Sequence, residues 1–148
     1  MFILIVGAGR VGSSLARAML RDGHQVSCLD EDSESHARLE IGLEKPWEDM
    51  GGQFTVGTGL EIEALEEAGI EHADAFVAAT DGDNTNIVIA QIATRRFKVP
   101  TVIARVLDPY RAKWYEDQGL RTICPTRVAI EMLEAEVKEA AAKVAGGA

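Results

Sequence analysis

The chain has 148 residues, of which 47% are hydrophobic and 26% charged, a composition typical of one soluble globular domain with a substantial core. The formal net charge of −9 argues against a nucleic acid as partner, because a phosphate backbone would be repelled. No apolar run approaches the length of a membrane span, and the short apolar N-terminus lacks the basic lead of a signal peptide. Cys28 and Cys124 have no metal-ligand or CxxC spacing, which favours buried free thiols in a reducing cytoplasm.

An apolar segment at residues 2–6 leads directly into Gly7-Ala8-Gly9-Arg10-Val11-Gly12, a GxGxxG turn. We expect a strand before this turn and a helix after it, over residues 11–22, which is the setting in which such a motif binds a nucleotide. The first glycine permits the tight turn, the second lets backbone approach a pyrophosphate, and the third brings helix and strand together. The phosphate would meet free N–H groups at the positive end of the helix dipole.

A second strand, expected over residues 25–29, ends in Asp30, eighteen positions after Gly12. This is close to the offset of about 20 residues at which a carboxylate accepts hydrogen bonds from a ribose diol, and it favours a nucleotide site over a purely structural turn. Because a carboxylate repels the extra phosphate of NADP, an unphosphorylated ribose is expected. Arg10 adds a positive charge inside the turn and would contact a phosphate, the alternative being a solvated arginine at the helix start.

Beyond Asp30 the chain alternates helices and strands, a pattern that predicts a parallel sheet covered on both faces. We expect helices over residues 33–43, 60–68 and 84–97, and one that opens at Pro109 and closes at Gly119. Strands are expected over residues 53–57, 75–79, 101–105 and 121–124, and a loop over residues 44–52. The prediction is a Rossmann-like, doubly wound α/β domain over residues 1–125, with a six-stranded, mainly parallel sheet.

Residues 126–148 are expected to form a separate element, with a helix over residues 126–144. Its apolar positions are spaced by three and four residues alternately, as in a coiled-coil seam: Ile130, Leu133, Val137, Ala140 and Val144. The helix either covers its own sheet or packs against another subunit or a downstream domain. Tyr110, Trp114 and Tyr115 are expected to be exposed on the preceding helix, with a place in the core as the alternative. We therefore expect at least a homodimer.

In an open parallel sheet, ligands bind outside the carboxyl ends of the strands, where the strand order reverses. The residues expected there are the glycine turn with Val11, then Asp30, Thr58, Thr80 and Arg105, which together form a nucleotide cradle. Arg105 either reaches a phosphate or pairs with an acidic neighbour.

No residue is expected to act as a catalyst or as a metal ligand. His24, His36 and His72 are each expected at the surface, rather than as a general base or a metal site.

The stretches that carry a family resemblance are Gly7-Ala8-Gly9-Arg10-Val11-Gly12, Gly23-His24-Gln25-Val26, Leu29-Asp30, Ala68-Gly69-Ile70, Ala79-Thr80 and Ala104-Arg105-Val106-Leu107-Asp108-Pro109. To about Thr126 the chain resembles the N-terminal nucleotide-binding domain of the TrkA/KTN/RCK family, the cytoplasmic regulators of potassium channels and transporters. The resemblance implies that the domain binds NAD(H) or ATP/ADP, forms a homo-oligomer (a dimer or a larger ring) at the inner face of the plasma membrane through a membrane potassium-transport subunit, and changes shape with the bound nucleotide.

Carried over by resemblance, Gly7, Gly9, Arg10 and Gly12 would contact phosphate, Asp30 the ribose and Thr80 the pocket wall, with Arg105 as a further contact. The chain departs from the family pattern at Thr58, where many relatives carry aspartate after the glycine, and in an extended loop over residues 45–52. The ligand-binding domain that follows in many members is absent from this sequence, and a single-domain member or a truncated chain remain alternatives.

The leading hypothesis is therefore a nucleotide-sensing regulatory subunit for potassium uptake that is not an enzyme. The first alternative is a small NAD-dependent oxidoreductase, which shares the glycine turn but usually needs a positioned acid or base. The second is a structural dimer module that has a pocket but no nucleotide affinity.

Overall fold

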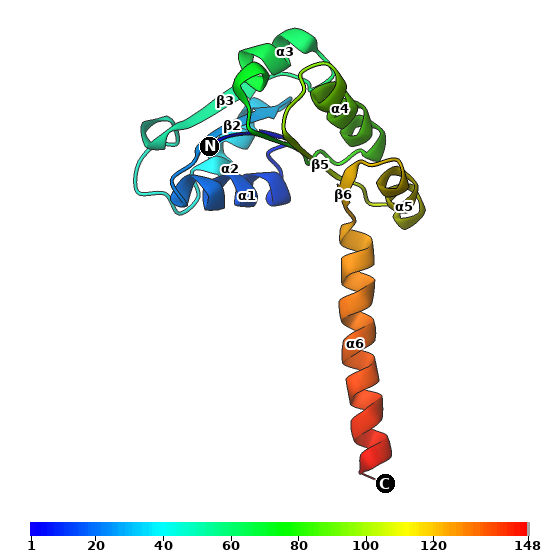
Figure 1. The fold of residues 1–148 in the computed structure, drawn as a ribbon. Coiled ribbons are helices and arrows are strands. Elements are labelled where there is room, and N and C mark those ends of the chain that lie inside the picture. The colour runs from blue at the N-terminus through cyan, green and yellow to red at the C-terminus, as the bar shows by residue number, and fades with distance from the viewer. Residues whose placement is uncertain (148) are drawn as a thin grey trace.

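Six strands form one sheet in which all five neighbouring pairs run parallel, so the sheet is wholly rather than mainly parallel. The computed structural model describes residues 1–147 (Figure 1). The strand order is β3-β2-β1-β4-β5-β6, which reverses direction between β1 and β4. The strands are β1 (Phe2–Val6), β2 (Gln25–Asp30), β3 (Gly52–Val56), β4 (Ala75–Ala78), β5 (Thr101–Arg105) and β6 (Arg121–Ile123).

Helices cover both faces of this sheet, as a doubly wound fold requires (Figure 1). They are α1 (Arg10–Arg21), α2 (His36–Leu39), α3 (Ile62–Glu67), α4 (Asp83–Arg95), α5 (Pro109–Asp117) and α6 (Pro125–Gly146), with short 3-10 turns η1 (Ser33–Ser35), η2 (Glu48–Met50) and η3 (Ile70–His72). Ile3 and Ile5 of β1 pack with α1 and α2. Leu4 and Val6 pack with α3 and α4. Burial on both faces explains the unbroken apolar sequence of this central strand.

The prediction of one helix over residues 33–43 is wrong, because the segment instead forms η1 followed by one turn of α-helix in α2. Asp32 favours the short turn, since its carboxylate accepts a hydrogen bond from the Glu34 N–H at 2.9 Å. Gly42 then adopts a left-handed φ of +74°, which ends helical geometry.

The loop expected over residues 44–52 contains η2 and a buried anchor. Trp47 is fully buried against the α1 side of the sheet. Its indole lies against Gly52, where any side chain would overlap the ring. The segment after α2 is therefore anchored to the core by Trp47 and is not a free surface loop.

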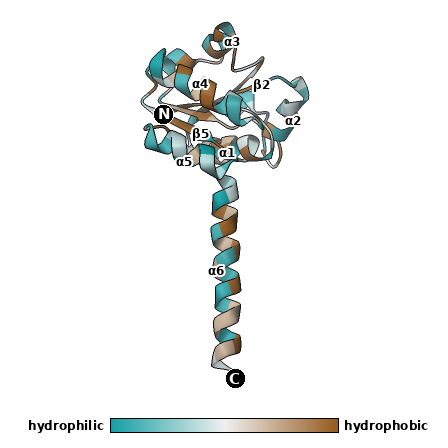
Figure 2. Cartoon of the chain, turned by 90° about the vertical axis from the view of Figure 1, so that its right-hand side faces the viewer, coloured by the Kyte–Doolittle hydropathy of each residue, from teal (hydrophilic) through white to brown (hydrophobic). Residues whose placement is uncertain are grey.

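The C-terminal helix α6 projects away from the sheet, and apolar bands run along it (Figures 1 and 2). Every residue from 128 to 147 is exposed, so the alternative in which this helix covers its own sheet is wrong. Arg127 fixes the base of α6 to α5, because its Nη2 lies 2.8 Å from Oε1 of Glu116. The hydrogen bond from Arg127 lowers the pKa of the Glu116 carboxyl below its ordinary value.

The aromatic side chains of α5 divide between surface and core. Tyr110 is 89% exposed and Trp114 58% exposed, as expected, whereas Tyr115 packs against the core. Within residues 1–147, no helix combines the length and apolar character needed to cross a bilayer.

Candidate functional site

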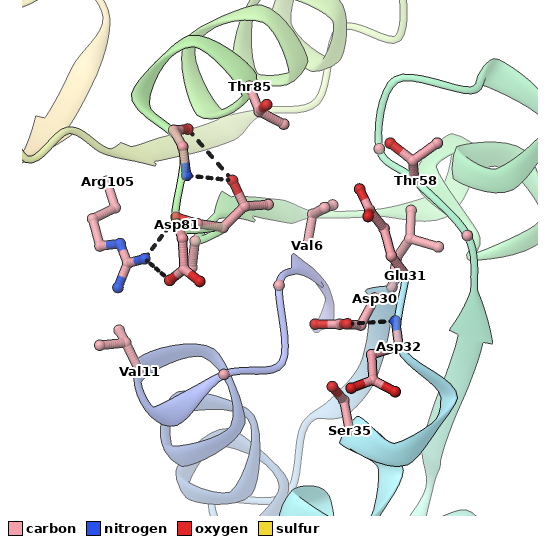
Figure 3. A pocket seen from close by; sticks show the side chains of 18 of the residues that line it. Val6, Val11, Asp30, Glu31, Asp32, Ser35, Thr58, Asp81, Thr85 and Arg105 are labelled. Carbon is pink, nitrogen blue, oxygen red and sulfur yellow. Dashed lines mark hydrogen bonds and ion pairs between the residues drawn. The ribbon is translucent and has the colours of Figure 1, made fainter.

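A cleft of about 810 Å³ opens at the carboxyl ends of the strands, beside the point where strand order reverses (Figure 3). Its volume lies in the range of small-molecule sites. The cleft brings together all the predicted site residues except Gly12, namely Gly7, Gly9, Arg10, Val11, Asp30, Thr58, Thr80 and Arg105. Figure 3 shows Arg105 and Asp81 on the opposite side of the glycine turn from Asp30 and Ser35.

The three glycines of the turn have different structural duties. Gly7 has a φ of +102°, and a Cβ there would lie 2.5 Å from the Ala79 carbonyl oxygen. Gly12 lies inside α1, where a Cβ would overlap the carbonyl oxygen of Gly7. A Cβ on Gly9 would meet no atom within 4 Å, since this residue faces the open cleft. Two glycines thus serve close packing, and Gly9 leaves room for a ligand against the backbone.

The start of α1 offers hydrogen-bond donors to that space. Gly9 is the N-cap and supplies no side chain to bond the first N–H groups of the helix. Arg10 is exposed on the cleft wall and makes no ion pair within residues 1–147. Such a helix start, with an adjacent guanidinium, suits an anion.

Asp30 joins the end of β2 to the glycine turn. Its Oδ2 accepts a hydrogen bond from the Ala8 N–H at 2.7 Å, and its Oδ1 accepts one from the Asp32 N–H at 2.8 Å. An ionised carboxylate has about four acceptor positions, so both oxygens keep capacity for ligand hydroxyls. Burial, together with the charge of Asp30, raises the pKa of the Cys28 thiol to about 12. That thiol is therefore neutral and unsuited to nucleophilic chemistry.

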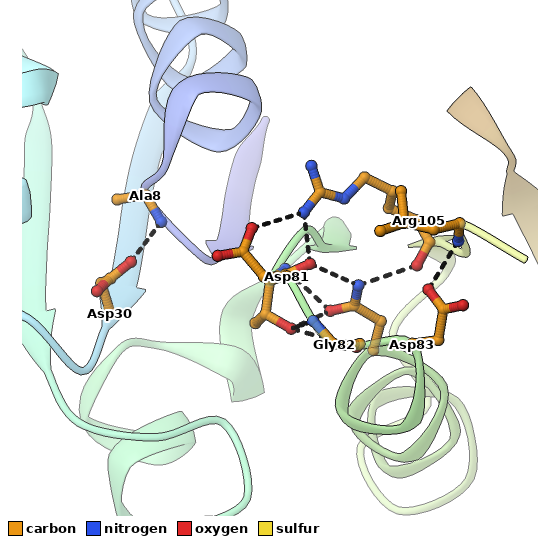
Figure 4. A network of polar contacts seen from close by, with 9 residues as sticks. Ala8, Asp30, Asp81, Gly82, Asp83 and Arg105 are labelled. Carbon is orange, nitrogen blue, oxygen red and sulfur yellow. Dashed lines mark hydrogen bonds and ion pairs between the residues drawn. The ribbon is translucent and has the colours of Figure 1, made fainter. Parts of the chain in front are cut away.

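The opposite wall of the cleft carries a network of polar contacts that includes Asp81, Asp83 and Arg105 (Figure 4). The network is built around Asn86, which is buried in the first turn of α4. Its Oδ1 accepts hydrogen bonds from the N–H and the hydroxyl of Thr80, at 2.9 and 2.6 Å. Its Nδ2 donates to the carbonyl oxygens of Thr80 and Arg105, both at 2.9 Å. One amide thus ties together the ends of β4 and β5.

Arg105 follows the second of its two predicted roles in this structure. Its Nη2 donates to the Thr80 carbonyl oxygen at 2.6 Å and lies 3.3 Å from Oδ1 of Asp81. Asp81 itself is fully exposed at the cleft, so this ion pair is accessible to a competing anion. Close by, the Asp83 carboxylate accepts hydrogen bonds from the Leu107 and Asp108 N–H groups, which links α4 to the start of α5.

The sequence did not predict several residues that line the cleft, among them Ser35, Arg38, Asp81 and Thr85. Arg38 Nη1 donates to Ser35 Oγ at 2.9 Å and also reaches the Ala8 carbonyl oxygen at 3.5 Å. Ser35 ends η1 and Arg38 lies on α2, whereas Asp81 lies on the loop after β4 and Thr85 in the first turn of α4. No sequence motif marks them individually. His24, His36 and His72 are all absent from the lining of this cleft.

Replacing Asn86 with aspartate is expected to lower the free energy of unfolding by about 3 kcal/mol, because a buried carboxylate oxygen would face two carbonyl oxygens. Denaturant unfolding monitored by circular dichroism would measure the loss. Asn84→Asp is the matched control, since Asn84 is exposed on the same helix and its side-chain oxygen already accepts from Arg111. Equal stability of the two variants would contradict a structural role for the Asn86 amide.

Comparisons with known proteins agree with this architecture. Residues 3–126 match the TrkA-N domain family. The Trk system potassium uptake protein TrkA of Streptomyces coelicolor is 42% identical over 127 residues, which make up 86% of this chain and 54% of that protein. The chain spans about half the length of the curated relatives it matches.

Two solved structures share the fold. The Kef CTD of Shewanella denitrificans in its AMP-bound form aligns with a TM-score of 0.73 at 23% identity, over 94% of this chain and 80% of that one. The GsuK channel bound to NAD aligns with a TM-score of 0.65 at 19% identity, over 86% of this chain and 22% of that one.

Proposed function

The chain belongs to the TrkA-N domain family, and on that premise we propose that it is a nucleotide-sensing regulatory component of a potassium uptake system. The observation that carries the proposal is the pairing of an open Gly9 and an uncapped helix start with the Asp30 carboxylate in one cleft. The ligand would be an adenine nucleotide, NAD(H) or ATP/ADP. Its membrane partner would be a potassium-transport subunit, which would place the chain at the inner face of the plasma membrane.

The cleft residues divide naturally between the two ends of such a nucleotide. Asp30 would accept the ribose hydroxyls, while Arg10 and the first N–H groups of α1 would hold the phosphates. Val11, Thr58 and Thr80 would form the walls. The AMP and NAD named for the two structural neighbours support this ligand class. The bound nucleotide would act on the membrane partner by changing the structure of this domain, and not by a chemical reaction.

Arg105 supplies the means by which a bound phosphate would change the protein. A phosphate would compete with Asp81 for its guanidinium, because the Asp81 side chain is exposed to solvent. A ligand that makes this exchange has different affinities for the paired and unpaired states, which is the condition for shifting their populations. Nucleotides that differ in phosphate content would therefore give different populations of the two states.

Calorimetric titration with NADH, NAD, ATP and ADP tests the proposal on the full chain. We expect saturable binding of at least one of these nucleotides, and weaker binding of NADP because Asp30 repels the 2′-phosphate. Failure of all four to bind would overturn the nucleotide-sensing role. Substrate-dependent oxidation of NADH would instead identify an oxidoreductase, although no histidine or cysteine among residues 1–147 lines the cleft.

We further propose that α6 mediates a homo-oligomer through its exposed seam. Leu133 is 66% and Val137 68% exposed, so these positions are free to pack against a second copy. The double variant Leu133→Glu, Val137→Glu should shift the mass measured by light scattering to that of a monomer, while the circular dichroism spectrum remains that of a folded domain. Ala135→Glu, Ala142→Glu adds the same charges on the opposite side of the helix and should leave the mass unchanged. A monomeric parent protein at high concentration would contradict this assembly.

A further inference from the structure

His36, Glu40 and Glu48 bring three metal-ligating side chains together outside the nucleotide cleft. His36 opens α2, Glu40 follows that helix as its C-cap, and Glu48 lies on η2. One ligand atom from each residue lies within 4.8 Å of the other two. We propose that these residues bind a divalent transition-metal ion, with Zn²⁺ as the best match to the donor set. The proposal is independent of the nucleotide function.

The three side chains converge from two segments of the chain. His36 and Glu40 are four residues apart, so their side chains project from the same side of the helix, as paired ligands do in helical metal motifs. His36 Nδ1 lies 3.6 Å from Oε1 of Glu40, and His36 Nε2 lies 2.6 Å from Oε1 of Glu48. Glu48 comes from a separate segment, and a bound ion would therefore fasten η2 to α2.

The donor set and its charge also favour a divalent cation at this place. Each ring nitrogen of His36 faces a carboxylate oxygen. One ring nitrogen would bind the ion, and a divalent charge would balance the two carboxylates. Imidazole combined with carboxylate suits Zn²⁺ or Co²⁺, whereas Mg²⁺ and Ca²⁺ prefer oxygen ligands alone.

Neighbouring groups hold two of the ligands in position. The second oxygen of Glu40, Oε2, accepts a hydrogen bond from the Trp47 N–H at 2.7 Å. The ring of His36 meets the Phe54 ring edge-on, with centroids 5.5 Å apart. Trp47 is fully buried and directly precedes Glu48, so the chain holds the third ligand next to a fixed anchor. Such supporting contacts orient the ligands of known metal sites.

The site also has an entry path. The side chains of His36, Glu40 and Glu48 are 31%, 37% and 53% exposed, which leaves the remaining coordination positions open to water. Three protein ligands with water in the fourth position is an arrangement that Zn²⁺ accepts.

The test is calorimetric titration of Zn²⁺ into the untagged, chelator-treated 148-residue chain. We expect one Zn²⁺ ion to bind per chain with saturation. The affinity for Zn²⁺ should be lower by more than about tenfold in His36→Gln and in Glu48→Gln. His72→Gln is the matched control, because His72 is exposed beside Glu71 on η3 and belongs to no such cluster. This variant should bind Zn²⁺ like the parent protein. Mg²⁺ should give no comparable binding.

A second measurement does not depend on the variants. The imidazole ¹⁵N resonances of His36 in the parent protein should shift on addition of one equivalent of Zn²⁺, to positions distinct from those of an imidazolium ion. The absence of saturable binding, an unchanged affinity in His36→Gln, or an unperturbed His36 spectrum would each overturn the proposal. In those cases the role of His36 is limited to its contacts with Glu40 and Glu48.

Discussion

Replacing Gly12 with alanine is expected to lower the free energy of unfolding by at least about 3 kcal/mol, since the new methyl group would overlap backbone rather than a movable side chain. The Cβ would fall on the carbonyl oxygen of Gly7, and Gly7 is itself fixed against Ala79 at the end of β4. Relief would require α1 to move away from the central strands. Denaturant unfolding or the melting temperature measures the loss of stability. A poor yield of soluble protein would indicate an even larger loss.

Gly9→Ala is the matched substitution in the same turn, with an opposite expected outcome. Gly9 has a φ of −74° and open space around its Cβ position, so alanine costs no more than about 1 kcal/mol as a poorer N-cap. Its methyl group would stand where a pyrophosphate approaches the backbone, and nucleotide affinity should therefore fall while the fold survives. If Gly12→Ala proved as stable as Gly9→Ala, the close packing of α1 on the turn would not limit stability.

Asp30→Ala is expected to weaken adenine-nucleotide binding by about 10- to 100-fold, the loss of charge-assisted hydrogen bonds to a ribose diol. The same change also removes the bonds that Asp30 accepts from the Ala8 and Asp32 N–H groups. The variant's melting temperature must therefore be measured beside its calorimetric affinity. Glu31→Ala is the control, because Glu31 is an exposed carboxylate that also lines the cleft, and its loss should change affinity by less than about fivefold.

A ligand without a ribose separates the two duties of Asp30. Inorganic pyrophosphate should bind the parent protein and Asp30→Ala alike if the carboxylate acts on the sugar. An equal loss for pyrophosphate and ADP would show that Asp30 acts by holding the glycine turn. Asp30→Asn does not substitute for this experiment, because its amide N–H would face one of the two backbone N–H donors.

Local sequence signals were sufficient for the sheet and for much of the cleft. The apolar run at residues 2–6 predicted a strand, and the alternation of strands and helices predicted a doubly wound, parallel sheet covered on both faces. Asp30 was identifiable because its distance from the glycine turn is set by one strand–helix–strand unit. These features depend on residues close together in the chain.

The parts that could not be predicted depend either on local turns that override helical periodicity or on contacts between distant residues. The helix expected after Asp30 is cut short by Asp32 and Gly42, which act through local turns that compete with helical periodicity. Trp47 looked like a loop residue because only its partners across the fold reveal its burial. Arg38 and Asp81 reach the cleft through tertiary placement, and the ion pair of Asp81 with Arg105 spans 24 positions.

Because α6 projects from the domain, a small rotation at its base produces a large displacement at its tip. A helix of 22 residues is about 33 Å long, so a tilt of about 10° at its base carries its tip through about 6 Å. That base is bonded to α5 through Arg127 and Glu116, and α5 begins at the loop that Asp83 holds beside the cleft. A displacement too small to disturb the core would thus become, at the far end of α6, a movement comparable to one full helical turn.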